Sequence, residues 1–232
     1  MKSTFTAAAL FASASAFSNS VPIYGTYPGW TDGLGQAHIE IMLFIDLLCS
    51  DCAEENPVIN ELMTTPWLNG TVADQIKLSF TPFPLPYHMF AFQVAQIVPY
   101  LMDLCIEDSQ ECYMDDYRNF CYANFTNVLS QVNMSEDEFI PWWTAQVAEA
   151  LDLDQATLES LYGSNDPYNT NQSTRDFWKY GTSNGISGTP SALVNGVLLG
   201  AVPFSVEGWM DLLNTVYASQ YHPTAHPSPI QN

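Results

Sequence analysis

A pair of cysteines closes an apolar run near the start of the chain. His38–Leu48 is almost continuously apolar and ends at Cys49, and two residues separate Cys49 from Cys52. Such a run is typical of a strand that is buried on both faces. The apolar positions within Ser50–Met63 then follow helical spacing, although Pro57 should kink that helix. The sequence therefore predicts a buried strand that passes directly into a helix, with a Cys-x-x-Cys pair at the junction.

Cysteines at the start of a helix favour redox chemistry. The unpaired N–H groups and the positive end of the helix dipole stabilise a thiolate, which is the nucleophile in disulfide exchange. Two intervening residues leave both sulfurs within bonding reach. We therefore predict that Cys49 attacks a disulfide and that Cys52 resolves the mixed disulfide.

Two other interpretations of the cysteine pair are possible. One is half of a zinc site, but no second pair of ligands follows at zinc spacing, and a lone His88 is typical of a loop or cap residue. The other is an inert structural disulfide, which so tight a loop disfavours. We predict no metal and no cofactor.

The rest of the chain divides into three parts. A second strand is predicted at Ile76–Phe83, and the pattern from Tyr87 to about Tyr162 is helical, with a possible capping box from Ser135 to Glu138. A further helix follows at about 172–182. Asn195-Gly196 between two apolar stretches predicts a hairpin with a type I′ turn, and Ser205 is the expected N-cap of a last helix that ends at Tyr217.

Gly188-Thr189-Pro190 stands directly before the predicted hairpin, where an X-Pro bond can be cis. Combined with the cysteine pair after the first strand, this constellation resembles the thioredoxin superfamily and, within it, the DsbA-like disulfide oxidoreductases. The matching segments are Phe44–Cys52, Pro84–His88 and Gly185–Pro190, and the resemblance covers roughly residues 36–218.

The resemblance implies an α/β protein with a thioredoxin fold, in which helices flank a central mixed sheet and an all-helical domain is inserted. The expected divisions are a signal peptide, an extended lead-in, the first half of the thioredoxin fold, the helical insertion, the second half and a flexible tail. Their boundaries are 1–16, 17–37, 38–86, 87–171, 172–218 and 219–232.

The resemblance also implies roles for site residues. Pro190 would be cis and lie against the cysteine pair, and the backbone of Thr189 would pair with an extended substrate. Ser50 stands where a proline is common. Asp51 stands where strong oxidants carry a histidine, so its charge should raise the pKa of Cys49 and make a weaker oxidant than bacterial DsbA.

Two more positions bear on proton transfer. Family members often carry a buried acid six residues before the first cysteine, where this chain has Leu43. Asp46 lies three residues before it, and we expect Asp46 to solvate or cap groups near the site rather than to react.

Three further cysteines lie in the helical part, namely Cys105, Cys112 and Cys121. We expect a Cys105–Cys112 disulfide that closes the turn between two helices. If those residues formed one continuous helix, their spacing of about 10 Å would forbid the bond. Cys121 would then be a buried small apolar residue or an intermolecular thiol.

The charge balance excludes some partners. The chain has 5 basic and 25 acidic residues, for a formal net charge of −20. Nucleic acids and anionic membrane surfaces require clustered basic residues, so both are disfavoured. The same charge should repel glutathione and favour neutral or basic polypeptides.

The N-terminus predicts secretion. Lys2 precedes a short apolar run, and Ala14 and Ala16 form a typical cleavage site. No later segment predicts a membrane span. Four sequons suggest a glycoprotein of the extracellular space or of the secretory-pathway or vacuolar lumen, and their asparagines are Asn69, Asn124, Asn133 and Asn171.

We therefore predict a secreted thiol–disulfide oxidoreductase that acts on polypeptide or small thiol and disulfide substrates. One alternative is a non-catalytic thioredoxin-like binding module that keeps the groove around Pro190. Another is a glutathione-transferase or isomerase relative, which would not need Cys52. The direction of electron flow and the oligomeric state stay open.

Overall fold

The computed structural model describes residues 28–33, 35–36, 38–107 and 112–221. The predicted signal peptide, most of the lead-in and residues 222–232 of the predicted tail lie outside the described residues. Residues 219–221, which we assigned to the tail, belong to the last helix, which continues past Tyr217. No helix within the described part is long and apolar enough to cross a membrane.

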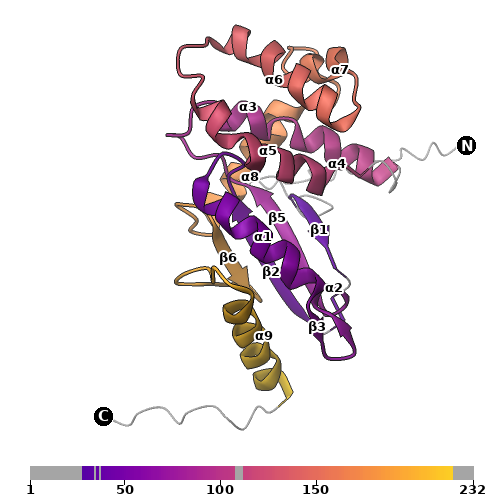
Figure 1. Cartoon of the computed structure of the whole chain (residues 1–232), viewed down its shortest axis with the longest axis vertical. Helices are drawn as coiled ribbons and strands as arrows, with labels where there is room; N and C mark the ends of the chain where they lie inside the picture. Colours follow the sequence, from indigo (N-terminus) through magenta and orange to yellow (C-terminus); the bar gives the residue numbers. More distant parts are fainter. Residues whose placement is uncertain (1–27, 34, 37, 108–111, 222–232) are drawn as a thin grey trace, which may run out of the picture.

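Five strands form the central sheet in the order β1-β5-β2-β6-β7 (Figure 1). Their bounds are Trp30–Asp32 (β1), Ile39–Ile45 (β2), Ile76–Pro82 (β5), Ser191–Val194 (β6) and Val197–Leu198 (β7). β2 and β5 are parallel, and the other neighbouring pairs are antiparallel. The sheet is therefore mixed, as the sequence predicted.

Edge strand β1 lies inside the segment that we expected to be an extended lead-in. It pairs with β5 so that Trp30 stands opposite Phe80, and the two rings stack with centroids 5.0 Å apart. A three-residue strand is too short to show an alternating pattern, so no periodicity predicted it. The stacked pair extends the core past the edge of β5.

Helices cover both faces of the sheet. α1 (Ser50–Thr64) and α9 (Val206–Tyr221) contact each other, and α8 (Thr170–Ser183) contacts β5. Successive side chains of β2 point to opposite faces. Leu43 and Ile45 share a small cavity with α1, whereas the Phe44 ring lies 6.0 Å from the Tyr180 ring of α8. Burial on both faces explains why β2 is almost continuously apolar.

The helical insertion lies between β5 and α8 along the chain and gathers beyond one end of the sheet (Figure 1). Its helices are α3 (Ala91–Ala95), α4 (Val98–Glu107), α5 (Met114–Leu129), α6 (Glu136–Leu151) and α7 (Gln155–Ser160). The predicted capping box begins α6, where the Glu138 carboxylate accepts the backbone N–H of Ser135 at 2.9 Å. The mixed sheet and the inserted group of helices confirm the predicted fold class, a thioredoxin-type sheet with an inserted helical domain.

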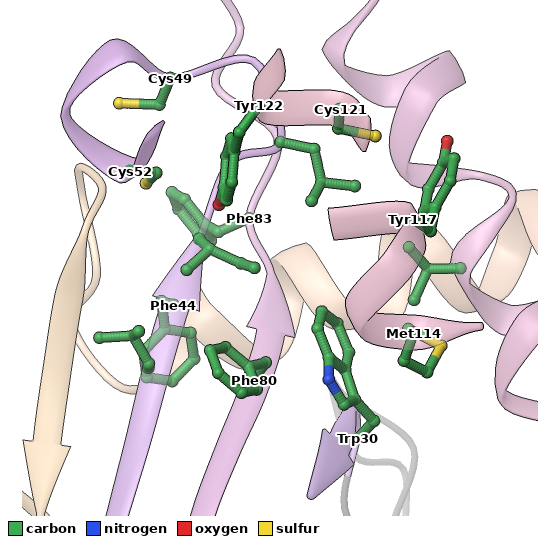
Figure 2. Close-up of a cluster of buried hydrophobic side chains, with 14 of the residues drawn as sticks. Trp30, Phe44, Cys49, Cys52, Phe80, Phe83, Met114, Tyr117, Cys121 and Tyr122 are labelled. Atoms are coloured by element: carbon green, nitrogen blue, oxygen red, sulfur yellow. The ribbon is translucent and has the colours of Figure 1, made fainter. Parts of the chain in front are cut away.

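One continuous core joins the insertion to the sheet. Phe80 of β5 lines a small cavity together with Arg118 and Tyr122 of α5, and the aromatic side chains of the sheet and of α5 belong to one buried cluster (Figure 2). Short elements close the opposite end of the sheet and were not predicted. They are β3 (Pro66–Trp67), β4 (Gly70–Thr71) and α2 (Val72–Gln75).

The hairpin that carries Pro190 forms as predicted. Asn195 and Gly196 have φ angles of 48° and 79°, so both central residues of the turn are left-handed. The register pairs Ser191 of β6 with Phe44 of β2. Because Phe44 lies near the carboxyl end of β2, this register brings Pro190 to the strand end from which Cys49 follows. Ser205 caps α9, and its hydroxyl accepts the N–H of Gly208 at 3.1 Å.

Candidate functional site

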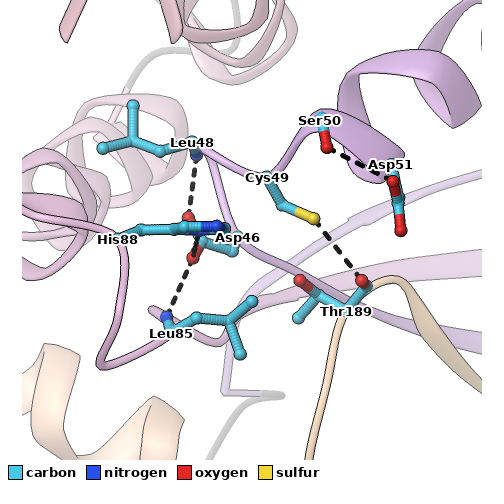
Figure 3. Close-up of polar contacts among 8 residues, drawn as sticks. All are labelled: Asp46, Leu48, Cys49, Ser50, Asp51, Leu85, His88 and Thr189. Carbon is cyan, nitrogen blue, oxygen red and sulfur yellow. Dashed lines mark hydrogen bonds and ion pairs between the residues drawn. The ribbon is translucent and has the colours of Figure 1, made fainter. Parts of the chain in front are cut away.

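The structure brings the cysteine pair and the Thr189-Pro190 segment together. Cys49 is the N-cap residue of α1, and Cys52 lies in its first turn. The Cys49 thiol donates to the carbonyl oxygen of Thr189 at 3.5 Å (Figure 3). The Thr189–Pro190 peptide bond is cis, and Pro190 lines the same small cavity as Cys52. These four residues therefore form one site.

The two thiols have opposite acidities. The pKa of Cys49 is lowered to about 6, chiefly by a hydrogen bond from Cys52 and further by the backbone N–H groups of Cys52 and Asp51, although burial opposes this. Burial raises the pKa of Cys52 well above its ordinary value, and the neighbouring Cys49 adds to the rise. At neutral pH, Cys49 is therefore mostly thiolate while Cys52 stays protonated.

The charge of Asp51 is not among the causes of the Cys49 pKa shift. Its exposed carboxylate accepts the Ser50 hydroxyl at 3.3 Å, while its backbone N–H stabilises the Cys49 thiolate. The pKa of Cys49 thus lies below the ordinary thiol value, because the hydrogen bonds from Cys52 and from the helix-start N–H groups outweigh the effect of burial. How Asp51 compares with a histidine at this position stays a prediction.

Asp46 holds the loops beside the cysteines in place. Its carboxylate is buried and accepts the backbone N–H groups of Leu48 and Leu85, each at 2.8 Å. The same carboxylate lies 2.8 Å from Nδ1 of His88 (Figure 3). Burial raises the pKa of Asp46, and these hydrogen bonds oppose the rise. Asp46 therefore caps the β2–α1 junction, and His88 acts as its loop partner.

Glu55 is a buried acid that our sequence interpretation missed. One carboxylate oxygen accepts the indole N–H of Trp209 at 2.7 Å, and the other has no hydrogen-bond partner among the described residues. Burial raises the pKa of Glu55 to about 7. Helical spacing places Cys52, Glu55 and Ile59 on one face of α1. A glutamate on an otherwise apolar helix face was the available sequence evidence.

A small cavity lies between Glu55 and the resolving cysteine. The cavity has about 10 Å³ of space for the centre of a water molecule, so it holds roughly one water. It is lined by Cys52, Glu55, Arg118 and Leu43. Two guanidinium nitrogens of Arg118 and the hydroxyl of Tyr122 are buried and have no hydrogen-bond partner among the described residues. Buried polar groups without a partner among the described residues therefore lie beside a largely apolar cavity next to Cys52.

The other cysteines have structural positions. Cys105 of α4 and Cys112 form a disulfide with a Cα–Cα distance of 4.2 Å. The bond is possible because α4 ends at Glu107 and α5 begins at Met114, so no single helix spans both residues. Cys121 is unpaired and fully buried in α5, which fits a small apolar core residue and not an intermolecular thiol.

The four sequons differ in accessibility. Asn69 and Asn133 are exposed in turns, and Asn171 is exposed near the start of α8. Asn124 is half-buried within α5, and its amide donates to the carbonyl of Phe120 at 2.9 Å. Glycosylation at these positions stays a prediction, with Asn124 the least suited of the four.

Comparison with known proteins identifies relatives in structure only. No protein-family model matches the chain, and no curated protein matches it in sequence. Among solved structures, alpha-DsbA1 from Wolbachia pipientis is 15% identical with a TM-score of 0.61, and the match covers 88% of this chain and 97% of that one.

Two further structures are similar at the same identity. BdbD from Bacillus subtilis is 15% identical with a TM-score of 0.56, and the match covers 82% of this chain and 93% of that one. A periplasmic thioredoxin-like protein from Salmonella enterica is 15% identical with a TM-score of 0.52, over 84% and 94% of the two chains. The chain therefore has the DsbA-like form of the thioredoxin fold, in which a helical domain is inserted beside the central sheet.

Proposed function

We propose that this protein is a thiol–disulfide oxidoreductase that exchanges disulfides with polypeptide or small thiol substrates through Cys49 and Cys52. One observation carries the proposal. Two thiols one helical turn apart have opposite pKa shifts, and the more acidic thiol lies against the Thr189 carbonyl. That asymmetry suits a nucleophile and a resolving thiol. The DsbA-like fold supports the same function.

The exchange has two steps. The Cys49 thiolate attacks one sulfur of a substrate disulfide, whose S–S bond breaks to release a substrate thiolate and leave a mixed disulfide. Cys52 then loses its proton and attacks the Cys49 sulfur, which forms the Cys49–Cys52 bond and releases the second substrate thiolate. The substrate gains two electrons and the protein loses two. The same steps in reverse oxidise a dithiol substrate.

Glu55 is the proposed proton acceptor for Cys52. The buried Cys52 thiol must lose a proton before it can attack, and its raised pKa makes that step unfavourable without a nearby base. Glu55 lines the same cavity, carries one oxygen without a partner among the described residues, and has a pKa near 7. One water molecule in the cavity would connect the carboxylate to the thiol.

The backbone of Thr189 is the proposed hydrogen-bonding partner of the substrate backbone. Its carbonyl accepts the Cys49 thiol only while that thiol carries a proton. Formation of the thiolate therefore frees the carbonyl to accept a backbone N–H from an extended substrate. Ionisation of Cys49 and substrate binding would thus favour each other.

We propose the extracellular space or a secretory-pathway lumen as the compartment. The Cys105–Cys112 disulfide suits an oxidising environment, and three sequon asparagines are exposed. A similar thioredoxin-like protein from Salmonella enterica is periplasmic. Mass spectrometry of the mature protein from the culture medium of its host would test cleavage after residue 16.

Insulin reduction by dithiothreitol tests the activity. We expect the wild-type protein to accelerate the reaction, Cys49→Ser to abolish it, and Cys52→Ser to accumulate a mixed disulfide that non-reducing electrophoresis detects. Cys121→Ala is the matched control and should keep wild-type activity. Inactive wild-type protein would favour a binding module. Glutathione-dependent activity that survives Cys52→Ser would favour the transferase-like alternative.

A further inference from the structure

A second concave surface lies beside the cysteine site. A groove of about 800 Å³ runs between the loop after β5 and helix α8. Leu85 and His88 line it, and both contact Asp46 at the β2–α1 junction (Figure 3). The groove therefore shares residues with the loop that contacts the segment leading to Cys49.

The walls of the groove present large apolar side chains to solvent. Met89 and Trp178 line it and are 47% and 42% exposed. The Trp178 indole stacks on the Phe83 ring at 5.9 Å between centroids, so one of its faces is supported by the core. A ring held in this way binds an apolar side chain at little cost in conformational entropy.

Arg175 gives the groove an unpaired positive charge. Four basic residues lie in the described part of the chain, and three of them pair with acidic residues, as Lys77 with Glu40, Arg118 with Asp115 and Lys179 with Asp176. Arg175 is the exception among the described residues.

The Arg175 guanidinium is held in place by two contacts and keeps N–H groups that can bind a ligand. Its Nε donates to the side chain of Asn171 at 2.8 Å, and the group lies 5.5 Å from the Phe92 ring centroid. Its other N–H groups form no hydrogen bond within the described part of the chain. A guanidinium fork of this kind binds a carboxylate with two parallel hydrogen bonds.

We propose that this groove binds an acidic, apolar peptide segment, with a carboxylate on Arg175 and a large apolar side chain between Met89 and Trp178. Its role as part of a disulfide substrate rests on the proposed function of the cysteine pair. The net charge of −20 predicts neutral or basic partners. At physiological ionic strength, charges beyond about 8 Å are screened, so the local charge at Arg175 decides which segment binds here.

Fluorescence anisotropy with a labelled, cysteine-free peptide tests the binding. The probe carries glutamates between phenylalanine and leucine residues, and a matched peptide has glutamine in place of each glutamate. We expect the acidic peptide to bind about tenfold more tightly. Arg175→Gln should remove this difference, Trp178→Ala should weaken both peptides, and the charge-matched control Lys77→Gln should change neither. Thermal unfolding of each variant verifies that it is folded.

Several results would overturn the proposal. Equal binding of the two peptides, or an Arg175→Gln variant with unchanged affinity, would exclude recognition of a carboxylate. Binding of a fatty acid without binding of the peptide would assign the groove to a small amphiphile. Self-association in sedimentation that Trp178→Ala abolishes would assign it to a second copy of the chain.

Parallel exchange assays separate this proposal from the proposed function. With Arg175→Gln we expect the kcat/KM for a glutamate-flanked peptide disulfide to fall about tenfold while exchange with a small neutral disulfide is unchanged. Peptide binding without any disulfide exchange would keep the groove and reject the oxidoreductase function. Exchange without peptide binding would reject the groove alone.

Discussion

At the scale of single residues, Cys49 and Cys52 have different pKa values because they occupy different positions at the start of α1. Cys49 precedes the first turn of α1, where backbone N–H groups have no partner inside the helix. Cys52 is inside that turn and only 2% exposed, so its charged form would be buried. The start of α1 thus stabilises the thiolate of Cys49 and keeps the Cys52 thiol protonated.

Replacing Asp51 with histidine should lower the pKa of Cys49 further. Wild-type alkylation by iodoacetamide should have its midpoint near pH 6, because only the thiolate reacts. The variant exchanges a negative charge for a group that can be positive, so its midpoint should lie lower. Asp51→Asn is the control and should fall between the two. Identical profiles for all three proteins would show that the Asp51 charge is irrelevant.

Glu55 should make stability fall as pH rises. Its pKa is 4.5 in an ordinary environment and about 7 in the folded protein, so the folded chain binds more protons than the unfolded chain between these values. The free energy of unfolding should therefore decrease across this window. Glu55→Gln removes that loss and should be relatively more stable at pH 8 than at pH 4 by about 1–3 kcal/mol. Urea unfolding under reducing conditions at both pH values measures this.

The same substitution separates the kinetic role of Glu55 from its structural role. Glu55→Gln should slow resolution of the mixed disulfide at least about tenfold, in keeping with loss of a general base. Alkylation of Cys49 should be unaffected, because Glu55 is not among the groups that shift its pKa. A variant with an unchanged resolution rate and pH profile would limit Glu55 to packing against Trp209.

At the scale of elements, the approach of α8 to the sheet depends on one small residue. Gly181 lies where a Cβ atom would meet the Phe83 ring, including its Cε2 atom at 2.8 Å. Phe83 is itself buried and stacks on Trp178. The contact therefore fixes both the helix and one wall of the groove.

Gly181→Ala should lower the free energy of unfolding by about 1–3 kcal/mol, which is the usual cost of overpacking a core. This should hold even though alanine favours a helix over glycine by about 1 kcal/mol. Gly200→Ala is the matched control, because nothing lies within 4 Å of a Cβ atom there. Urea denaturation of both variants measures the difference, and equal stability would mean that α8 can shift without cost.

At the scale of the whole molecule, the acidic surface sets the background for the cysteine site. Four basic residues lie in the described part, and none of them appears among the causes of the Cys49 pKa shift. The thiolate is therefore stabilised by hydrogen bonds from backbone and thiol groups instead of by cationic side chains. A site of this kind should discriminate against anionic reagents.

Cys49 should thus react more slowly with iodoacetate than with iodoacetamide, relative to the same ratio for free cysteine. The difference should shrink in high salt, because screening shortens the Debye length to about 3 Å at 1 M. Alkylation rates at pH 7 across a salt series measure this. A ratio that does not depend on salt would mean that the net charge of −20 is not felt at Cys49.

The sequence by itself determined the features whose causes are local. The apolar run before Cys49, the Asn195-Gly196 turn and the Ser135 capping box each follow from neighbouring residues, so local hydrophobicity, turn chemistry and helix caps predicted them. The fold class was implied by the resemblance that the cysteine pair and the Gly188-Thr189-Pro190 segment carry.

Only the tertiary structure decided which distant groups meet. Cys49 lies 140 residues from Thr189, and Glu55 lies 154 residues from Trp209. No periodicity connects such pairs, because their contact depends on strand register and on how helices pack on the sheet. The lack of an acidic partner for Arg175 also depends on the tertiary structure. The sequence shows how many acidic and basic residues there are, but only the fold decides which of them form ion pairs.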